Sequence, residues 1–265
     1  MFNITLSTNK TLILIDASYY VFYRYFATSK WYNIQKKDYT EEEFNISFIK
    51  HLQSDIKKIT KKWKTDINNI IFCLDCARTN IWRNDYFSEY KSTRILNNNF
   101  NQNIFGVFYN YLKEKKINTI YCEKLEADDI VYLTHLSVKN ELNKITIITN
   151  DNDYLQLISE NTEIVNMQFK NILLRTKLTT SNSILIFKAL LGDKSDNIPK
   201  VGSGINKETA IKMANDKLML KNWLDKHNLN DKFEFNLKLI SFEYIPIELQ
   251  NNFNTLYKFN IKNDY

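Results

Sequence analysis

Nine acidic residues stand in five groups along the chain, spaced so that their side chains could act together. Four of the groups follow short apolar runs that are typical of buried strands, at residues 11–15, 70–74, 119–122 and 145–148. Ligands in open α/β sheets bind beyond the carboxyl ends of the strands, so we expect these acids to converge on one crevice. The groups are Asp16, Asp75, the run Glu126, Asp128 and Asp129, the pair Asp151 and Asp153, and the pair Asp193 and Asp196.

So many carboxylates in one crevice would repel one another unless divalent cations neutralised them. Oxygen ligands in this number favour Mg²⁺ or Mn²⁺. Two such ions about 4 Å apart can activate a water molecule and stabilise the leaving oxygen of a phosphodiester. A carboxylate in the first turn of a helix is also favoured by the helix dipole, which explains one acid of the run 126–129 better than three. For residues 150–153, a turn or a helix cap is the alternative.

The charge of the chain indicates a polyanionic partner. The sequence has 36 Lys and Arg against 30 Asp and Glu, a formal net charge of +6. Without the nine acids, 36 basic residues stand against 21 acidic ones, which leaves +15 for the rest of the molecule. A basic body around an acidic crevice is typical of a protein that binds nucleic acid. From charge alone, a basic protein with no nucleic-acid role is an equal alternative.

Cysteine content and hydropathy limit the cellular compartments in which the protein is expected. Three cysteines argue against a disulfide framework and for a reducing compartment. Cys73 and Cys76 form a lone C-x-x-C pair, which cannot close a four-ligand zinc site, so a structural role is predicted. No apolar run approaches the roughly 20 residues of a membrane helix, and no secretory leader is visible. We expect a soluble, intracellular protein without a membrane partner, and its many Asn, Lys and Ile residues are typical of an AT-rich genome such as that of a virus.

The hydrophobic pattern alternates strands with helices, which predicts an α/β fold with a parallel sheet flanked by helices. Residues 78–103 show no core period and are rich in Arg, Lys, Tyr and Asn. After about residue 178 the strand pattern stops, and the remainder is predicted to be mainly helical. The expected helices cover residues 17–27, 41–64, 107–116 and 127–140, and another begins at residue 154.

The motifs around the acids resemble those of the 5′-nuclease family, which includes flap endonucleases, phage 5′-exonucleases and the 5′-nuclease domain of bacterial DNA polymerase I. The most specific match is Gly-Asp-Lys-Ser-Asp-Asn-Ile-Pro at residues 192–199, at the entry to a helix–three-turn–helix. The resemblance runs in family order over about residues 11–215. The other matching motifs lie at residues 14–16, 73–75, 82–86, 90–94, 126–129 and 149–153.

The resemblance implies a PIN-like core with a twisted parallel sheet at residues 1–177, with an arch or gateway over the site at about 78–103. Residues 178–265 would form a helical duplex-binding region, the helix–three-turn–helix, followed by C-terminal helices. The resemblance assigns one set of acids to a first metal ion: Asp16, Asp75, Glu126, Asp128 and Asp129. It assigns a second set to a second ion: Asp151, Asp153, Asp193 and Asp196.

The resemblance also assigns residues to DNA. Lys91 and Arg94 match basic residues that grip the scissile phosphate, where their charge would stabilise the transition state. Without the motif, a solvated helix face would be the favoured explanation for both. Tyr90 stands where an aromatic ring could stack on a base. The further predicted DNA contacts are Arg83, Gly202, Ser203, Gly204, Ile205 and Lys207.

Two parts of the chain depart from the family pattern. In the hairpin, Asn206 replaces a glycine, although Asn tolerates the left-handed conformation that such a turn needs. The departure weakens the case for a backbone grip on phosphate and for a K⁺ ion at this hairpin. Near the C-terminus, Gln250, Phe253 and Leu256 have the spacing of a sliding-clamp peptide with the wrong residue types. An amphipathic helix is the simpler prediction there, without a clamp partner.

These observations predict a Mg²⁺-dependent, structure-specific 5′-nuclease, in which Mn²⁺ would substitute. It would act in DNA replication, repair or recombination as a flap endonuclease and 5′→3′ exonuclease on DNA with 5′ flaps, nicks or gaps. RNA–DNA hybrids would also be substrates if it removes RNA primers. Two alternatives are a PIN-class metal-dependent ribonuclease, which would lack the region 192–210, and a non-enzymatic DNA-junction binder, which would not need all nine acids.

Overall fold

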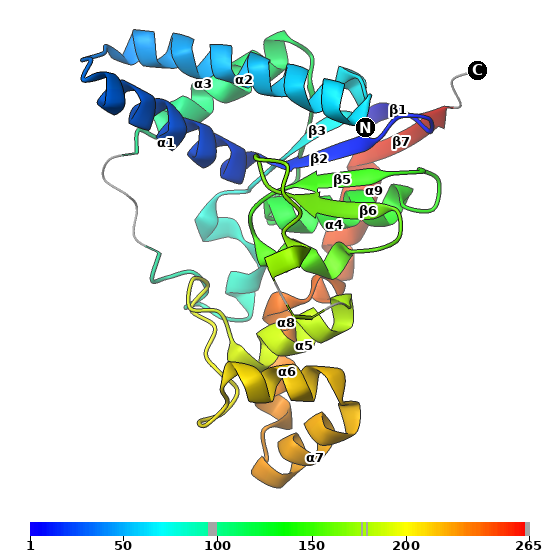
Figure 1. Cartoon of the computed structure of the whole chain (residues 1–265). Helices are drawn as coiled ribbons and strands as arrows, with labels where there is room; N and C mark the ends of the chain where they lie inside the picture. Colours follow the sequence, from blue (N-terminus) through cyan, green and yellow to red (C-terminus); the bar gives the residue numbers. More distant parts are fainter. Residues whose placement is uncertain (95–99, 176, 179, 263–265) are drawn as a thin grey trace.

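A five-stranded parallel sheet forms the centre of the protein in the computed structural model, which describes residues 1–94, 100–175, 177–178 and 180–262 (Figure 1). The strand order is β4-β3-β2-β5-β6. The predicted α/β class and parallel sheet are therefore confirmed, and the four expected strands are present within one residue of their predicted bounds. The strands are β2 (Leu12–Asp16), β3 (Ile70–Leu74), β4 (Asn118–Tyr121), β5 (Ile145–Ile148) and β6 (Thr162–Val165).

Helices cover both faces of this sheet. One face carries α1 (Ala17–Gln35), α2 (Glu41–Trp63) and α3 (Asn103–Glu114), and the other carries α4 (Ala127–Val138) (Figure 1). Successive side chains of a strand point to opposite faces. Ile13 and Ile15 accordingly pack among the residues of α1–α3, whereas Leu12 and Leu14 pack on the α4 side. All four side chains are fully buried, so β2 anchors both layers.

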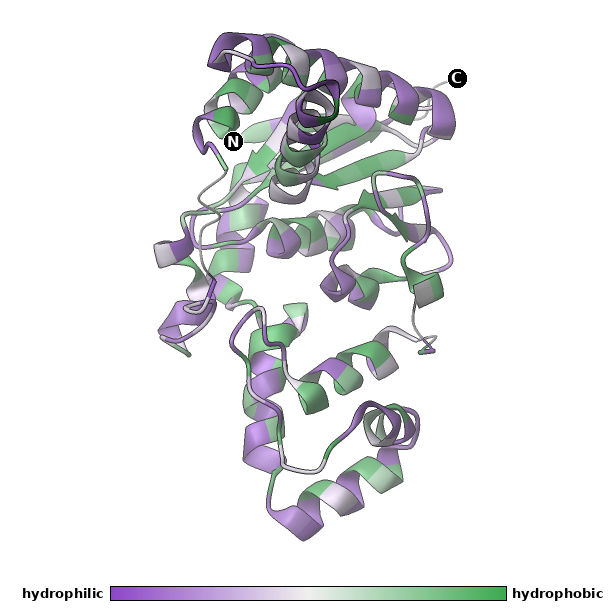
Figure 2. Ribbon diagram, turned by 60° about the vertical axis from the view of Figure 1, so that its left-hand side comes forward, coloured by the Kyte–Doolittle hydropathy of each residue, from purple (hydrophilic) through white to green (hydrophobic). Residues whose placement is uncertain are grey.

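The lower part of the molecule is helical (Figure 1). Figure 2 shows mainly hydrophobic strands in the sheet and mixed, amphipathic colouring on these helices. Gly192 ends α5 at φ +66°, and a Cβ there would lie 2.3 Å from the carbonyl oxygen of Ile198, so only glycine fits this turn. The helices are α5 (Ser181–Leu191), α6 (Lys207–Asn215), α7 (Lys217–His227), α8 (Asn230–Ile240) and α9 (Ile247–Leu256).

The two ends of the described chain meet in a second, two-stranded parallel sheet. β1 (Phe2–Ser7) pairs with β7 (Tyr257–Lys262), with Phe2 opposite Tyr257. The hydrophobic pattern predicted neither of these strands, nor β6. The region after residue 178 is mainly helical, as predicted, but from residue 257 onward it forms strand β7 and not a further helix. The predicted amphipathic helix is present as α9, which ends where β7 begins.

None of the helices among the described residues is both long enough and apolar enough to cross a membrane.

Candidate active site

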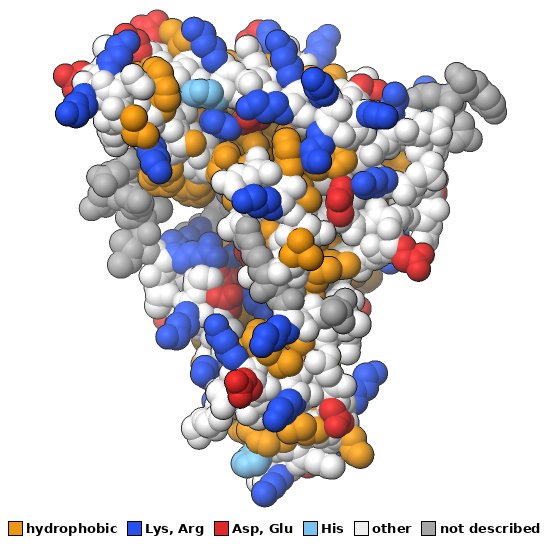
Figure 3. Space-filling view, in the orientation of Figure 1, with side chains coloured by type: hydrophobic (Ala, Val, Ile, Leu, Met, Phe, Trp, Pro, Cys, Tyr) orange, Lys and Arg blue, Asp and Glu red, His pale blue; other side chains and the backbone are white. Residues whose placement is uncertain are grey.

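A cleft with a volume of about 1370 Å³ lies beyond the carboxyl ends of the strands, between the sheet and the helical lower part. Lys and Arg side chains border the hollow at the left of the space-filling view (Figure 3). The predicted convergence of the acids is confirmed for six of the nine. Those that line the cleft are Asp16, Asp75, Glu126, Asp128, Asp151 and Asp193.

Asp16 and Asp75 are fixed at the ends of neighbouring strands. Asp16 ends β2 and caps α1, because its carboxylate accepts a hydrogen bond from the backbone N–H of Tyr19 at 2.9 Å. It also accepts one from the hydroxyl of Tyr154 at 3.0 Å. Asp75 follows β3 and accepts from the backbone N–H of Ala127 at 2.8 Å. Burial, followed by repulsion from Asp75, raises the pKa of Asp16 to about 7.

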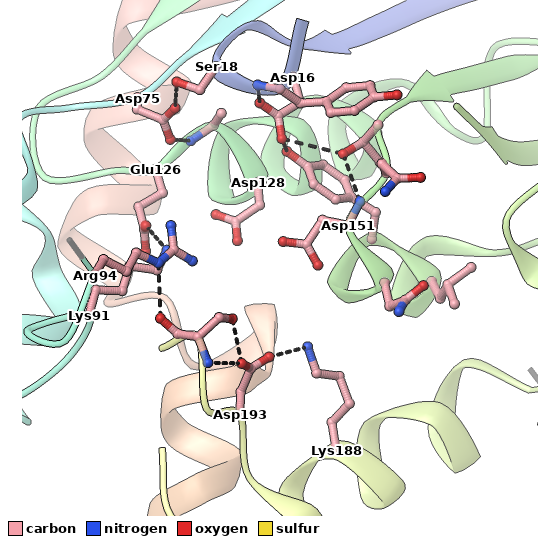
Figure 4. A pocket seen from close by; sticks show the side chains of 18 of the residues that line it. Asp16, Ser18, Asp75, Lys91, Arg94, Glu126, Asp128, Asp151, Lys188 and Asp193 are labelled. Atoms are coloured by element: carbon pink, nitrogen blue, oxygen red, sulfur yellow. Dashed lines mark hydrogen bonds and ion pairs between the residues drawn. The ribbon is translucent and has the colours of Figure 1, made fainter. Parts of the chain in front are cut away.

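The first turn of α4 brings further carboxylates to the cleft. Ligand oxygens of Glu126, Asp128 and Asp129 lie within 4.8 Å of one another. Asp128 and Asp151 both project into the open space (Figure 4). Burial, together with Asp129 and Glu126, raises the pKa of Asp128 well above its ordinary value. For Glu126, the charges of Lys91 and Arg83 outweigh burial and lower the pKa.

Asp129 faces away from the cleft and is fully buried. Its carboxylate accepts two hydrogen bonds from the guanidinium of Arg83, at 2.8 and 2.9 Å, and one from the indole of Trp82 at 2.9 Å. The backbone N–H of Glu126 donates to the same carboxylate at 3.1 Å. Both carboxylate oxygens of Asp129 are therefore engaged in hydrogen bonds that fix the start of α4. The assignment of Asp129 as a metal ligand stays a prediction.

Arg83 and Tyr90 are placed differently from the DNA-contact residues predicted above. Arg83 is 1% exposed, and its Nε donates to the carbonyl oxygen of Leu239 at 2.8 Å. The hydroxyl of Tyr90 donates to Glu126 at 3.1 Å and Asp196 at 3.2 Å, and Tyr90 is 5% exposed. A ring with so little accessible surface cannot stack on a base, and the guanidinium is used entirely within the protein. Their role is to support the carboxylates.

Lys91 and Arg94 line the cleft, and their contact with the scissile phosphate stays a prediction. The ammonium of Lys91 forms an ion pair with Glu126 and lies 3.8 Å from Asp196. Burial lowers the pKa of Lys91, but these two acids outweigh it and raise the pKa overall. Arg94 pairs with Asp196, and its side chain is 44% exposed. A phosphate could therefore approach Arg94 directly, whereas Lys91 has to release Glu126 first.

The segment 78–94 borders the cleft but is more than a surface arch. Trp82 is 2% exposed, and Arg83, Tyr90 and Lys91 are also buried and contact acids of the site. The stretch has no core period, as the sequence analysis found, but it still contributes buried side chains, because its aromatic and Arg residues follow no helical or strand period. The middle of the predicted arch, residues 95–99, lies outside the described residues.

The remaining acids have lysine or arginine partners. Lys188 of α5 forms ion pairs with Asp153 and with Asp193, the latter at 3.1 Å. The dashed line from Lys188 to Asp193 in Figure 4 marks the second pair. Burial would raise the pKa of Asp193, but Lys188 and Ser195 lower it below its ordinary value. Asp196 is buried between Arg94, Lys91 and Tyr90, and neither it nor Asp153 lines the cleft.

The donor chemistry of the upper part of the cleft fits a hard divalent cation. Among the described residues, Asp16, Asp75 and Asp128 have no Lys or Arg within ion-pair distance. Burial raises the pKa of each, and repulsion between the acids adds to the effect. Oxygen ligands that repel one another in this way are stabilised by a cation such as Mg²⁺.

The predicted hairpin lies between α5 and α6. Gly204 has φ +84°, and Ser203 and Gly204 are exposed, whereas Ile205 is 3% exposed and its side chain packs into the core. Lys207 begins α6 and lines the cleft. Asn206 does not take the left-handed conformation that the sequence analysis allowed for. Its φ is −105°, and its side chain caps α6 by accepting from the backbone N–H of Thr209 at 2.9 Å.

Several residues at the cleft were missed by sequence reasoning. Lys188 gave no signal beyond a cation four residues before Gly192, and Arg78 was assigned no role. Arg78 supports the basic pair by donating to the carbonyl oxygen of Arg94 at 3.0 Å. An aromatic wall, which we define as Tyr19, Phe22, Phe100, Phe105 and Tyr109, lines the side of the cleft formed by α1 and α3. The aromatic content of residues 17–27 was the available signal.

Relatives of known name share most of the chain. A 5′-3′ exonuclease of Buchnera aphidicola subsp. Acyrthosiphon pisum is 28% identical over 250 residues, covering 92% of this chain and 82% of that protein. The protein named ribonuclease H of Enterobacteria phage T4 is 29% identical over 238 residues, covering 80% and 77%. The Bacillus subtilis 5′-3′ exonuclease is 28% identical over 215 residues, covering 77% and 70%.

Solved structures share the fold. The phage T5 protein co-crystallised with metal ions superposes with a TM-score of 0.69 at 15% identity, covering 93% of this chain and 97% of that one. A T5 flap endonuclease variant, in a pseudo-enzyme–product complex with DNA and metal ions, gives a TM-score of 0.67 at 16% identity with the same coverage. The model of the 5′-3′ exonuclease N-terminal, resolvase-like domain matches residues 11–183, about two thirds of the chain. This chain therefore belongs to the 5′-3′ exonuclease family, which confirms the predicted resemblance to 5′-nucleases.

Proposed function

We propose that this protein is a divalent-metal-dependent, structure-specific 5′-nuclease that hydrolyses phosphodiesters where a 5′ single strand meets a duplex. One observation carries the proposal: Asp16, Asp75 and Asp128 converge on one cleft, and no Lys or Arg of the described residues lies within ion-pair distance of them. Basic residues border the same cleft at Lys91 and Arg94. Acids without a cationic partner, next to an Arg94 side chain that is 44% exposed, fit a site for metal ions and a phosphate.

The carboxylates would hold Mg²⁺, with Mn²⁺ as a substitute. Asp16, Asp75 and Asp128 would hold the first ion, and Asp151, Asp153 and Asp193 would hold a second. Bound ions would supply the activation of a water molecule and the stabilisation of the leaving oxygen. The protein contributes fixed ligand positions, because hydroxyl groups of Tyr154 and Ser18 donate to Asp16 and Asp75 and hold their carboxylates in place.

Lys91 and Arg94 would orient the scissile phosphate and stabilise the extra negative charge of the transition state. Arg94 is accessible in the DNA-free protein, whereas Lys91 is held by Glu126. We infer that Lys91 moves to the phosphate when a cation takes its place beside Glu126. Arg78 fixes the turn that carries both residues.

The region 178–265 would hold the duplex behind the junction, and the region 1–177 would form the catalytic core. The exposed backbone of Ser203 and Gly204 and the side chain of Lys207 suit a contact with phosphates that is blind to sequence. A K⁺ ion held by the hairpin carbonyls belongs to the same proposal. One family structure contains DNA, and the T4 relative is named a ribonuclease, so RNA–DNA hybrids belong among the candidate substrates.

End-labelled substrates incubated with Mg²⁺ test this proposal against its alternatives. We expect cleavage of a 5′-flap DNA near the junction, shortening of a nicked duplex from its 5′ end, and no reaction in excess EDTA. Cleavage of single-stranded RNA alone would favour a ribonuclease of the PIN class. Tight binding of the flap without any cleavage, in Mg²⁺ or Mn²⁺, would favour a non-enzymatic junction binder.

A further inference from the structure

The acids of the site divide into two sets by their contacts with cationic side chains. Asp16, Asp75 and Asp128 have no such partner among the described residues, and the same holds for Asp151, which lies between the two sets in the chain. Asp193, on the opposite side of the cleft, and Asp153, which does not line it, share the ammonium of Lys188. The net charge that a divalent cation would meet therefore differs between the two sets, although both consist of carboxylates.

Lys188 is built into the site and is not a surface lysine that reaches it by chance. Its side chain is 13% exposed and projects from the last turns of α5 into the cleft (Figure 4). It joins two separate segments, because Asp153 follows β5 whereas Asp193 follows α5. The turn at Gly192, where no side chain fits, fixes the position of Asp193 relative to Lys188.

We propose that the ammonium of Lys188 occupies the place of the second divalent cation in the DNA-free, metal-free protein and has to move aside before that cation binds. This proposal rests on the two-ion nuclease function proposed above. Two carboxylates with a lysine between them carry a net charge of −1, whereas the same pair alone carries −2. Lys188 would thus make the second site weak and leave the first site, without an internal cation, as the strong one.

The consequence is ordered loading. The first ion would bind at Asp16, Asp75 and Asp128 at low metal concentration, and the second only when Lys188 gives up Asp153 and Asp193. A phosphate in the cleft offers the displaced ammonium a new anionic partner, so substrate would favour the loaded state. Lys188 is in this sense a positioning residue that couples occupancy of the second site to the presence of substrate.

Mn²⁺ binding without DNA, followed by the electron paramagnetic resonance signal of free Mn²⁺, tests the proposal. The variant Lys188→Met keeps the length of the side chain and removes its charge. Wild type should show one strong and one weak class of site, and Lys188→Met should strengthen the weak class at least about tenfold while leaving the strong class unchanged. Lys188→Arg, which keeps the charge, should behave like wild type.

Lys194→Met is the matched control, because Lys194 is exposed, is close in sequence and removes the same charge. It should leave both classes of site unchanged. If Lys188→Met is too unstable to titrate, Lys188→Gln serves in its place. As a second readout, added Mn²⁺ should raise the melting temperature of the Lys188 variant more than that of wild type, since tighter binding gives more stabilisation.

The outcomes separate this proposal from the nuclease assignment. An unchanged or weakened second class in Lys188→Met would overturn the role of Lys188 and leave the nuclease assignment standing. A similar gain in Lys194→Met would also overturn it, because the effect would then reflect overall charge. The absence of any Mn²⁺ binding in wild type would instead contradict the proposed metal-dependent function itself.

Discussion

The guanidinium of Arg83 donates two hydrogen bonds to the carboxylate of Asp129, with lengths of 2.8 and 2.9 Å. This ion pair lies beneath the turn of α4 that presents Glu126 and Asp128. Both partners are almost completely buried. The pair joins residues 46 positions apart and ties the segment after β3 to the start of α4. The orientation of two acids at the cleft therefore depends on an ion pair that does not itself reach the cleft.

Breaking this pair should cost stability. Arg83→Met leaves Asp129 buried without a cation, and we expect a loss of about 3–5 kcal/mol in the free energy of unfolding, measured by urea denaturation. Lys124→Ala is the control, because it breaks the exposed pair with Asp85 and should cost less than about 1 kcal/mol. Equal costs for the two variants would contradict the structural role of Arg83.

The metal-free protein should respond to pH through Asp16. Its pKa in the folded protein is about 7, against an ordinary value of 3.8, so its contribution to stability is complete below about pH 4 and is lost as the pH rises through 7. Asp16→Asn removes this loss. In EDTA, the stability of the variant relative to wild type should increase between pH 4 and 7.5 by on the order of 1 kcal/mol or more.

Urea denaturation at the two pH values measures this difference, and subtraction of wild type cancels other groups such as His135, whose pKa burial lowers to about 4. Asp85→Asn, at an exposed position, should show no such pH-dependent gain. A relative stability of Asp16→Asn that stays constant across this range would show that Asp16 ionises normally in the folded protein.

The aromatic wall should bind unpaired bases of the 5′ strand. Phe22 is 40% exposed and faces the cleft beside Phe100, with ring centroids 4.5 Å apart. Phe22→Ala should weaken the binding of a 5′-flap DNA by about 1–3 kcal/mol, as for other base-stacking residues, and change the binding of blunt duplex little. Trp31→Ala, on the same helix but outside the cleft, is the control. Fluorescence anisotropy would distinguish the two, and equal losses on flap and duplex would contradict base stacking.

The hairpin should hold the duplex without taking part in chemistry. Gly204 has φ +84°, so Gly204→Val strains the backbone although a Cβ there would meet no atom within 4 Å. We expect weaker binding of every duplex-bearing substrate and a nearly unchanged single-turnover rate at saturating DNA. Gly106→Ala is the matched control, because its Cβ also meets open space, but within helix α3 and without the positive φ. If Gly204→Val binds duplex as tightly as wild type, the duplex is held elsewhere.

The sequence predicted those parts of the fold that local patterns encode. β2, β3 and β5 are continuous apolar runs that end near an acid, and their acids mark the ligand edge of a parallel sheet. β1 and β7 each alternate polar and apolar residues, which is the local signal of a half-buried strand, and this signal was overlooked. Their pairing joins positions 255 residues apart along the chain. No local pattern could show that the two ends form one sheet.

The candidate site was predictable as a set of acids but not as a set of contacts. The spacing placed Asp16, Asp75 and Asp128 together, because strand ends and the first turn of a helix fix their direction. The spacing could not show that Arg83 and Tyr90 are buried beneath these acids. A sequence motif gives the residue types but not whether each side chain faces the protein interior or the substrate. Lys188 was missed for a similar reason. The local sequence around a lysine in a helix does not show whether its ammonium forms an ion pair or faces solvent.

The single-turnover cleavage of one 5′-flap DNA in Mg²⁺ by wild type and by Asp128→Asn tests the central claim most directly. Asp85→Asn makes the same chemical change at an exposed position away from the cleft and serves as the control. We predict that Asp128→Asn binds the flap with nearly wild-type affinity and lowers the rate at least about a hundredfold, because a ligand of the first ion is lost. Cleavage by Asp128→Asn at the rate of wild type and Asp85→Asn would contradict the assignment of this cleft as a metal-dependent nuclease site.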